Sequence, residues 1–207
     1  MKDIGILNEI KRLKSLADVG LLYCKNEYDK ERYLELQQIS LNLFAEVSGT
    51  SREDLTCIFP PAKDYPTAKV DIRGVMISAD KKILLVQESV DGKWSLPGGW
   101  ADIGFSPKET IIKECKEETG LDVIPDRLLA VFDKKMHPHP PQPFYVYKMV
   151  FYCRELTTEI TKGFDVLDVD YFAFDNLPTL SEDRILSSQI KLLVTKVLED
   201  DYEVYVD

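Results

Sequence analysis

The chain has 207 residues, 44% of them hydrophobic, and a formal net charge of −10 at pH 7. This length allows one substantial domain and a smaller one, and the acidic balance argues against a broad basic surface for duplex nucleic acid. No stretch approaches a membrane span and no signal peptide is evident, so we expect a cytoplasmic protein. Four scattered cysteines without a Cys-x-x-Cys pair predict free thiols, with neither a zinc site nor a disulfide framework.

Two amphipathic helices are predicted first, over residues 4–21 and 27–47. Asn26 or Asp29 is a candidate N-cap for the second, and Gly49 is a candidate end. Two helices cannot bury their apolar stripes alone, so they pack either on the following domain or on a second copy of the chain. The stripe residues are Ile6, Leu7, Ile10, Leu13, Leu16 and Ala17, then Tyr33, Leu36, Ile39, Leu43, Phe44 and Val47.

A proline-containing link follows the two helices. Pro60 and Pro61 force extended backbone, and Pro66 follows shortly after. We therefore expect a boundary here, with an N-terminal helical domain over 1–66 and a second domain over 67–207.

The second region alternates strand and helix signals, which predicts an α/β fold with a mixed sheet between helices. Aromatic and β-branched residues mark strands over 70–77, 83–87, 128–132, 145–153 and 170–174. A final amphipathic helix is predicted over 182–198. Its expected inner face holds Ile185, Leu186, Ile190, Leu193, Val194 and Val197.

A further helix is strongly marked between the second and third of these strands. Ser106 is a candidate N-cap, Pro107 suits the first helical position, and Glu109 completes a capping box. Gly120 is a candidate C-terminal residue in the left-handed conformation.

Three carboxylates in this helix point to metal binding. Glu114, Glu117 and Glu118 are spaced three and four residues apart, so they project toward one face and repel each other near the helix C-terminus. Divalent cations such as Mg²⁺ or Mn²⁺, more than one ion in all, would remove this repulsion. An ordinary amphipathic helix with a solvated acidic face is the alternative.

The segment from Gly99 to Leu121, preceded by Gly98, resembles the Nudix box, whose usual pattern is G-x5-E-x7-R-E-U-x-E-E-x-G-U with U aliphatic. Phe105 stands where the family has its first glutamate, and Lys113 where it has arginine. The lysine keeps the charge without the two-pronged grip of a guanidinium. The matching positions are Gly99, Glu114, Glu117, Glu118, Gly120 and Leu121.

The resemblance extends over the flanking segments 81–88, 94–100 and 172–178, and covers roughly Ala68 to Asp207. It implies the Nudix α/β/α sandwich and metal-dependent hydrolysis of a pyrophosphate bond. Glu114, Glu117 and Glu118 would hold the metal together with a carbonyl at Gly99. A metal-bound water would attack one phosphorus.

The catalytic base is not given by the box, because Phe105 cannot serve. Related enzymes often carry a carboxylate on a loop before the last strand, and Asp165 and Asp168 fall there in this sequence. We predict catalytic roles for these two aspartates and for Glu117 and Glu118, of which Glu118 could itself orient the water. A solvated loop is the alternative for both aspartates.

Substrate contacts are expected from aromatic and basic side chains. Trp94, Trp100 and Phe105 are candidates to stack a base, although Trp94 can equally be a core residue. His137 and His139 lie in a proline-rich loop that would face substrate, or else form a surface turn. Arg73 completes the expected substrate-binding set.

The N-terminal helices and the segments 28–33, 65–74 and 135–141 resemble bacterial Nudix proteins with a helical extension, some of them ADP-ribose pyrophosphatases. The CDP-choline pyrophosphatase group is the most similar. It implies hydrolysis of CDP-choline to CMP and phosphocholine, and a homodimer formed through the N-terminal helices. Alternatives are ADP-ribose or another nucleoside diphosphate sugar, 3′–5′ exonuclease action on short RNA ends, or a non-catalytic ligand-binding regulator.

Overall fold

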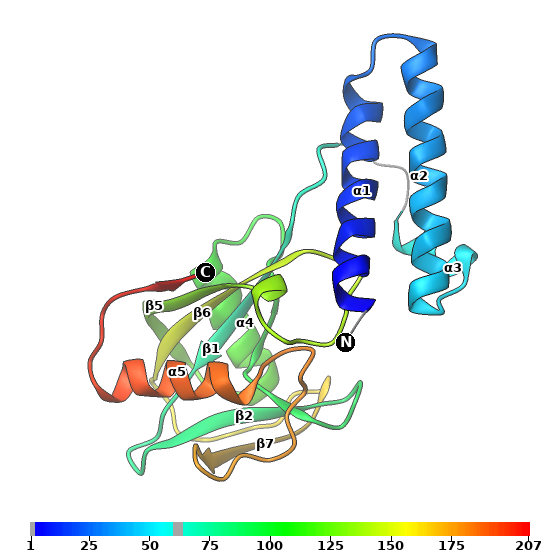
Figure 1. The fold of residues 1–207 in the computed structure, drawn as a ribbon. Helices are drawn as coiled ribbons and strands as arrows, with labels where there is room; N and C mark the ends of the chain where they lie inside the picture. The colour runs from blue at the N-terminus through cyan, green and yellow to red at the C-terminus, as the bar shows by residue number, and fades with distance from the viewer. Residues whose placement is uncertain (1–2, 60–63) are drawn as a thin grey trace. The chain divides into compact units, whose positions relative to one another are not determined.

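The computed structural model describes residues 3–59 and 64–207, which form two compact units (Figure 1). The helical unit contains the described residues up to Ala68 together with the segment 141–144. The sheet unit contains Lys69–Pro140 and Tyr145–Asp207. Pro60 and Pro61 lie outside the described residues, and the expected division at residues 66 and 67 stays a prediction.

The helical unit contains the two predicted helices and a third, short one. Helix α1 spans Asp3–Tyr23, α2 spans Glu27–Ser48 and α3 spans Arg52–Ile58. Asn26 caps α2, because its Oδ1 accepts a hydrogen bond of 2.8 Å from the Asp29 N–H. Gly49 ends α2 in the left-handed conformation. The sequence analysis missed α3.

The predicted stripe of α2 is only partly covered within the single chain. Ile39 and Leu43 were expected to pack on the following domain or on a second copy of the chain, and in the single chain their side chains remain 41% and 39% exposed. The face of α2 that packs on α1 carries polar residues instead: Gln37 donates to Asp18, which also accepts from Lys14. These polar groups satisfy each other in the seam between the helices. The apolar core of the unit consists of Leu7, Ile10, Leu41, Phe44 and Leu55.

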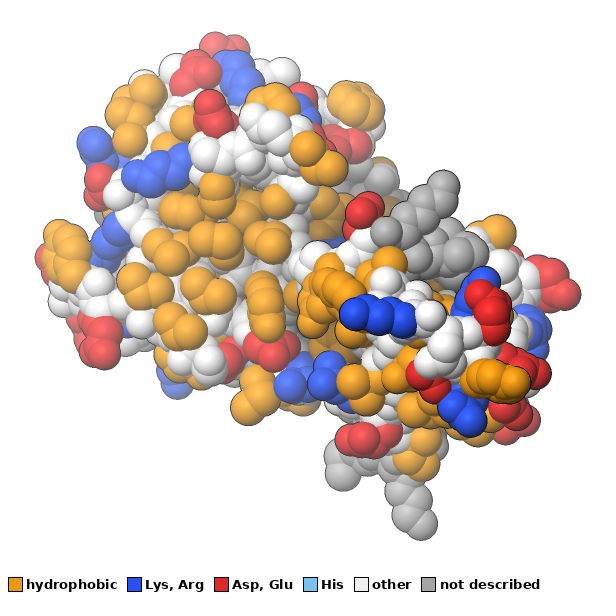
Figure 2. All heavy atoms as spheres, turned by 90° about the horizontal axis from the view of Figure 1, so that it is seen from above, with side chains coloured by type: hydrophobic (Ala, Val, Ile, Leu, Met, Phe, Trp, Pro, Cys, Tyr) orange, Lys and Arg blue, Asp and Glu red, His pale blue; other side chains and the backbone are white. Residues whose placement is uncertain are grey.

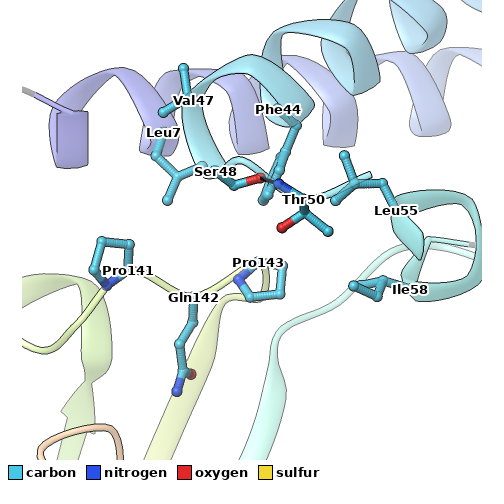
Figure 3. Close-up of a pocket in the computed structure, with 10 residues that line it drawn as sticks. All are labelled: Leu7, Phe44, Val47, Ser48, Thr50, Leu55, Ile58, Pro141, Gln142 and Pro143. Carbon is cyan, nitrogen blue, oxygen red and sulfur yellow. Dashed lines mark hydrogen bonds between the residues drawn. The ribbon is translucent and has the colours of Figure 1, made fainter. Parts of the chain in front are cut away.

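A pocket of about 380 Å³ lies within the helical unit (Figure 3). Its walls come from α1, α2 and α3, and from the segment 141–143, which belongs to this unit although it lies far along the chain. The Phe144 ring packs edge-on against Phe59, and its carbonyl accepts a hydrogen bond from Lys11. The lining residues are Leu7, Phe44, Val47, Ser48, Thr50, Leu55, Ile58, Pro141, Gln142 and Pro143.

The sheet unit holds two sheets that together mix parallel and antiparallel pairs. The larger has the order β4-β1-β6-β5-β8, formed by Gly98–Trp100, Lys69–Val75, Val146–Glu155, Val123–Asp133 and Tyr205–Val206. Strands β1 and β6 are parallel, whereas β5 and β6 are antiparallel. The smaller sheet has the order β3-β2-β7, formed by Trp94–Ser95, Lys82–Glu88 and Val166–Ala173. The five longer strands confirm the predicted ones, and β3, β4 and β8 were not predicted.

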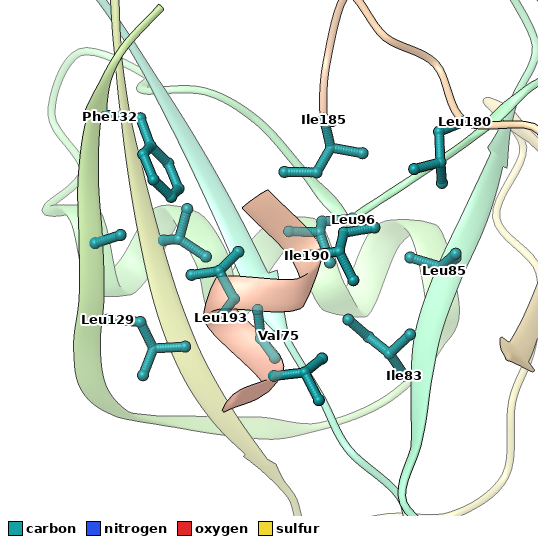
Figure 4. Packing of buried hydrophobic residues seen from close by; sticks show 13 residues of the cluster. Val75, Ile83, Leu85, Leu96, Leu129, Phe132, Leu180, Ile185, Ile190 and Leu193 are labelled. Carbon is teal, nitrogen blue, oxygen red and sulfur yellow. The ribbon is translucent and has the colours of Figure 1, made fainter. Parts of the chain in front are cut away.

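Two helices bury their apolar faces in separate cores of this unit. Helix α4 (Pro107–Thr119) contributes Ile111 and Cys115 to one core. Helix α5 (Ser187–Leu198) contributes Ile190 and Leu193 to the other (Figure 4). Sheets between helices confirm the expected α/β class. The three box glutamates, Glu114, Glu117 and Glu118, stand on this same helix α4.

Helix α5 starts at Ser187, five residues later than predicted. A tight turn precedes it, in which the backbone N–H groups of Arg184 and Ile185 both bond to the Ser181 carbonyl. The apolar spacing misled the prediction because Ile185 and Leu186 are buried even though they lie before the helix.

Hydrophobic side chains also reach the surface, and on the face seen in Figure 2 they gather in groups among charged residues. Within the described residues, none of the helices is both long and apolar enough to cross a membrane.

Candidate active site

The site is built around the glycine strand β4, which pairs antiparallel with β1. Gly98 has φ of 136°, and a Cβ there would lie 2.1 Å from the Ile72 carbonyl oxygen. Only glycine allows this approach. It aims the Gly98 N–H at Glu118, whose Oε2 accepts a hydrogen bond of 2.8 Å.

Helix α4 begins and ends where predicted. Ser106 Oγ accepts from the Glu109 N–H, and Glu109 Oε2 accepts from the Ser106 N–H at 2.8 Å. Gly120 ends the helix with φ of 74°. The capped helix presents the three box glutamates beside the glycine strand.

Glu118 is the most deeply buried of the three glutamates, with 5% of its surface exposed. Its pKa is raised to about 8, chiefly by burial and also by the neighbouring carboxylates of Glu88 and Glu114. The Arg73 guanidinium and the Gly98 N–H act in the opposite direction. The protein surroundings therefore do not fully stabilise the ionised form of the Glu118 carboxyl group.

Glu114 lies against the backbone of the glycine strand. A Cβ at Gly99 would lie only 2.8 Å from Glu114 Oε1, so a larger residue here would displace the Glu114 carboxylate. Burial raises the pKa of Glu114, and the charges of Glu117 and Asp165 add to the shift. The charges of Lys113 and Arg73 lower it.

These carboxylates fit a divalent cation by their donor chemistry and by their charge. Within the described residues, no three Asp, Glu, His or Cys side chains are already grouped tightly enough to enclose an ion. Nevertheless, Glu114 and Glu118 are partly or fully buried and each raises the pKa of its neighbours, a strain that a cation relieves. Carboxylate oxygens are the donors that Mg²⁺ and Mn²⁺ prefer.

Glu117 is more exposed than Glu114 and Glu118, and it shares the Lys113 ammonium group with Asp102 of the loop before α4. Its Oε2 lies 3.6 Å from Lys113 Nζ, whereas Asp102 Oδ2 lies 3.0 Å from the same nitrogen. Hydrogen bonding to Asp102 is the main cause of the raised pKa of Lys113. The sequence analysis missed Asp102, because nothing local marks a loop aspartate eleven residues from its partner.

The loop before β7 packs on the end of α4. The Gly163 N–H donates to the Glu118 carbonyl at 3.0 Å, and a Cβ at Gly163 would lie 2.0 Å from the Glu117 carbonyl oxygen. This brings Asp165 close enough to influence the pKa of Glu114. Asp168 lies farther along, on β7 opposite Gln87, where it accepts a bond from the Val169 N–H.

Arg73 is buried in an ionic network under the site. Its Nε lies 2.9 Å from Asp71 Oδ1, and its Nη1 donates to the Leu96 carbonyl. Lys148, from the parallel neighbour β6, pairs with the other oxygen of Asp71 at 2.6 Å. Arg73 therefore acts on the site through its charge near Glu118, and its donors are engaged within the protein.

The three predicted aromatic residues lie in different environments. Trp94 packs edge-on against Phe172, with ring centroids 4.6 Å apart, and joins the α5 core. Trp100 and Phe105 are about half exposed, at 50% and 48%. Lys69 lies over the Trp100 ring and Lys113 over the Phe105 ring. Of these three aromatic residues, Trp100 and Phe105 therefore keep accessible ring surface, whereas Trp94 packs on the α5 core.

Both histidines of the proline-rich loop are engaged by protein groups. His137 Nε2 lies 2.8 Å from Asp207 Oδ2. His139 is buried, and its Nδ1 bonds to the Glu182 carbonyl at 2.6 Å. Burial lowers the pKa of His139 to about 4. These contacts hold the loop in place, and a role in substrate binding stays a proposal for both.

Family models match both parts of the chain. Residues 68–192 match the NUDIX domain, and residues 5–59 match a domain described as a UDP-X-like, N-terminal oligomerisation domain. The chain belongs to the Nudix family. The box residues, the sheets between helices and the helical extension agree with this membership, and the resemblance found in the sequence is confirmed.

Named relatives of this Nudix hydrolase share most of its length. The Bacillus subtilis protein named "Putative ADP-ribose pyrophosphatase YjhB" is 39% identical over 97% of this chain and 96% of its own. A crystal structure of UDP-X diphosphatase, 34% identical, covers both chains completely with a TM-score of 0.64. The structure of an ADP-ribose pyrophosphatase from Streptococcus suis, 38% identical, covers 68% of this chain and 100% of its own, with a TM-score of 0.61. Nudix hydrolases generally depend on divalent metal ions.

Proposed function

We propose that this Nudix hydrolase cleaves the pyrophosphate bond of a nucleoside diphosphate linked to a second group, with Mg²⁺ or Mn²⁺ as cofactor. The observation that carries the proposal is the pair of neighbouring carboxyl groups beside the glycine strand, of which Glu118 is buried and Glu114 partly buried, and of which the Glu114 charge raises the pKa of Glu118. A cation that these carboxylates hold would also bind phosphate oxygens. The printed names of the relatives, ADP-ribose pyrophosphatase and UDP-X diphosphatase, support this substrate class.

The roles of the residues follow from their positions. Glu114, Glu117 and Glu118, with a carbonyl at Gly99, would hold the cation, which supplies neutralisation of the phosphates and a more acidic bound water. Asp165 is the candidate base, because its loop is fixed on the end of α4. Asp168 is the weaker candidate, since it lies farther along on β7. Arg73 keeps positive charge beneath Glu118, and Trp100 and Phe105 offer ring faces to a base.

The second group of the substrate is proposed as choline, so that cleavage of the pyrophosphate bond of CDP-choline yields CMP and phosphocholine. Its test is a panel of CDP-choline, ADP-ribose, a UDP-sugar and a short RNA, each assayed with Mg²⁺ and with Mn²⁺. Fastest release of CMP from CDP-choline supports the choline assignment. Faster cleavage of ADP-ribose or the UDP-sugar would support the pyrophosphatase activity but contradict CDP-choline as the substrate. Cleavage of RNA alone would contradict both the pyrophosphatase activity and the CDP-choline assignment.

The first prediction concerns Glu118→Gln. This substitution keeps the shape of the side chain but removes a metal-binding charge, so we expect kcat/KM to fall by about 100-fold or more. The neutral amide suits a buried position whose carboxyl has a pKa of about 8, so the melting temperature without metal should not fall at pH 8. Steady-state kinetics and thermal melting measure the two effects.

Glu199→Gln is the matched control, because Glu199 is exposed beyond the end of α5 in the same unit. It should leave both quantities unchanged. Full activity of Glu118→Gln would contradict the metal assignment.

We also propose that the protein is a cytoplasmic homodimer that forms through its helical unit. The match to an oligomerisation domain over residues 5–59 supports self-association. The exposed apolar side chains of α1 and α2, among them Leu16, Ile39 and Leu43, offer a surface for it.

A further inference from the structure

The Lys113 ammonium lies between two carboxylates and is closer to one of them. Its Nζ donates a hydrogen bond of 3.0 Å to Asp102 Oδ2 and lies 3.6 Å from Glu117 Oε2. Glu117 follows Lys113 by four residues in α4, a spacing at which helical side chains meet. Asp102 instead reaches Lys113 from the loop before the helix. Asp102 and Glu117 therefore share the Lys113 ammonium group, and its shorter contact is to Asp102 in the loop.

The loop is shaped so that Asp102 faces the helix. The Phe105 N–H donates to the Asp102 carbonyl at 3.2 Å and closes a tight turn. Gly104 takes the left-handed conformation in this turn, with φ of 96°. Lys113 Nζ also lies 5.7 Å from the centre of the Phe105 ring. The lysine thus contacts both ends of the turn that leads into α4.

We propose that Asp102 is a positioning residue that holds Lys113 away from Glu117 and leaves the Glu117 carboxylate available to a divalent cation. The inference rests on the proposed function, in which Glu117 is a metal ligand. A lysine without the loop carboxylate would pair with Glu117 alone and compete with the cation for it. Position 105 holds phenylalanine, and Asp102 is the one acidic residue between Gly99 and Ser106 in the sequence. It supplies the partner that the lysine needs.

Asp102→Asn tests the proposal in the full-length protein. Calorimetric titration with Mn²⁺, without substrate, measures metal affinity directly, independently of turnover. We expect the Kd for Mn²⁺ to rise by about three- to fivefold, the size that an exposed ion pair supports. The melting temperature should stay near that of the wild type, because the pair is exposed. Asp102→Glu keeps a carboxylate and should restore most of the affinity.

The role of Lys113 is isolated by repeating the substitution in a Lys113→Met background. Removal of the lysine also removes the competition, so Asp102→Asn should then change the Kd by less than about twofold. An equal loss of affinity in both backgrounds would mean that Asp102 acts on the cation itself, and would overturn the proposal.

The same helix offers a matched control at its other end. Lys116 pairs with Asp122 at 3.0 Å, and both side chains are about half exposed, at 53% and 51%. Asp122→Asn therefore removes the same charge from the same kind of pair and should leave the Kd unchanged. Wild-type protein that binds no Mn²⁺ would refute the proposed function itself. Wild-type protein that binds Mn²⁺ as tightly as Asp102→Asn would refute only the role of Asp102.

Discussion

At the scale of single residues, His139 shows how burial fixes a protonation state. Its Nδ1 bonds to the Glu182 carbonyl, and among the described residues no protein group bonds to its buried Nε2. A second proton would bring a buried, unpaired N–H and a positive charge near Lys134 and Lys148. The ring is therefore held neutral, and its pKa is lowered to about 4, chiefly by burial.

This lowered pKa predicts a loss of stability in acid. A base whose pKa is depressed on folding stabilises the protein fully above its ordinary value of 6.5, and this contribution is lost as the pH falls through about 4. We expect up to about 3 kcal/mol less unfolding free energy at pH 4 than at pH 7 from this group. Urea unfolding at a series of pH values measures it.

The comparison variant is His139→Gln, which cannot titrate in this range. Its stability should be lower than that of the wild type at pH 7 but should change less between pH 7 and pH 4. Parallel pH profiles for the two proteins would refute the assignment. The wild type is best measured with and without Mn²⁺, because the box glutamates also titrate.

At the scale of elements, close backbone contacts fasten the loop before β7 to the end of α4. Gly163 approaches the Glu117 carbonyl so closely that a Cβ would lie 2.0 Å from it, and Thr161 donates to the Thr119 carbonyl. Backbone atoms cannot yield as a flexible side chain can. The distance between Asp165 and the box glutamates is therefore set by a glycine.

Gly163→Ala should displace this loop from the helix. We expect a loss of about 1–3 kcal/mol in unfolding free energy, the usual cost of overpacking. We also expect kcat to fall more than KM rises, because the candidate base moves away from the metal. Gly5→Ala is the control, since nothing lies within 4 Å of a Cβ there. Wild-type kinetics in Gly163→Ala would argue against any function for the loop.

The elements that sequence alone predicted are those with local causes. Helix α4 was predicted from Ser106 to Gly120 because its capping box and its glycine end lie within the helix itself. The short strands β3, β4 and β8 have two or three residues each and exist only because a neighbour pairs with them. The predicted start of α5 was too early because the spacing of apolar residues indicates which residues are buried, not which are helical. Ile185 and Leu186 are buried although they lie in the turn before the helix.

The same distinction applies to the site. The box glutamates and glycines stand in one continuous segment, so their pattern could be found in the sequence. Arg73 was expected only as a substrate-binding residue, and the Asp71–Lys148 pair beside it depends on the parallel register of β1 and β6. Asp102 was missed because a loop conformation brings it to Lys113. Contacts of this kind require the fold.

At the scale of the whole molecule, the helical unit carries an apolar surface that its own core does not use. Ile39 and Leu43 lie one helical turn apart on α2 and are exposed, whereas Gln37 of α2 is buried and donates a hydrogen bond to Asp18 of α1. A helix with two differently composed faces is typical of one that binds a second partner. Here the proposed partner is a second copy.

Replacement of both Ile39 and Leu43 by serine should therefore weaken the dimer without unfolding the protein. Light scattering after size exclusion should show a shift toward the monomer mass at micromolar concentration, with the helical circular dichroism signal retained. The same double change at Glu31 and Glu35, also exposed on α2, is the matched control and should leave the dimer intact. An unchanged mass in the Ile39 and Leu43 variant would place the interface elsewhere.

The segment 141–144 has a consequence for anyone who divides this protein. It lies in the loop between η1 (Lys134–Met136) and β6, yet Pro141 and Pro143 line the pocket of the helical unit and the Phe144 ring packs against Phe59. The backbone thus enters that unit twice. Deletion of the first 66 residues would remove the neighbours of these side chains and leave an apolar, solvent-exposed segment 141–144 on the remaining hydrolase domain. To produce the sheet unit by itself, the segment 141–144 must also be replaced by a shorter, polar one.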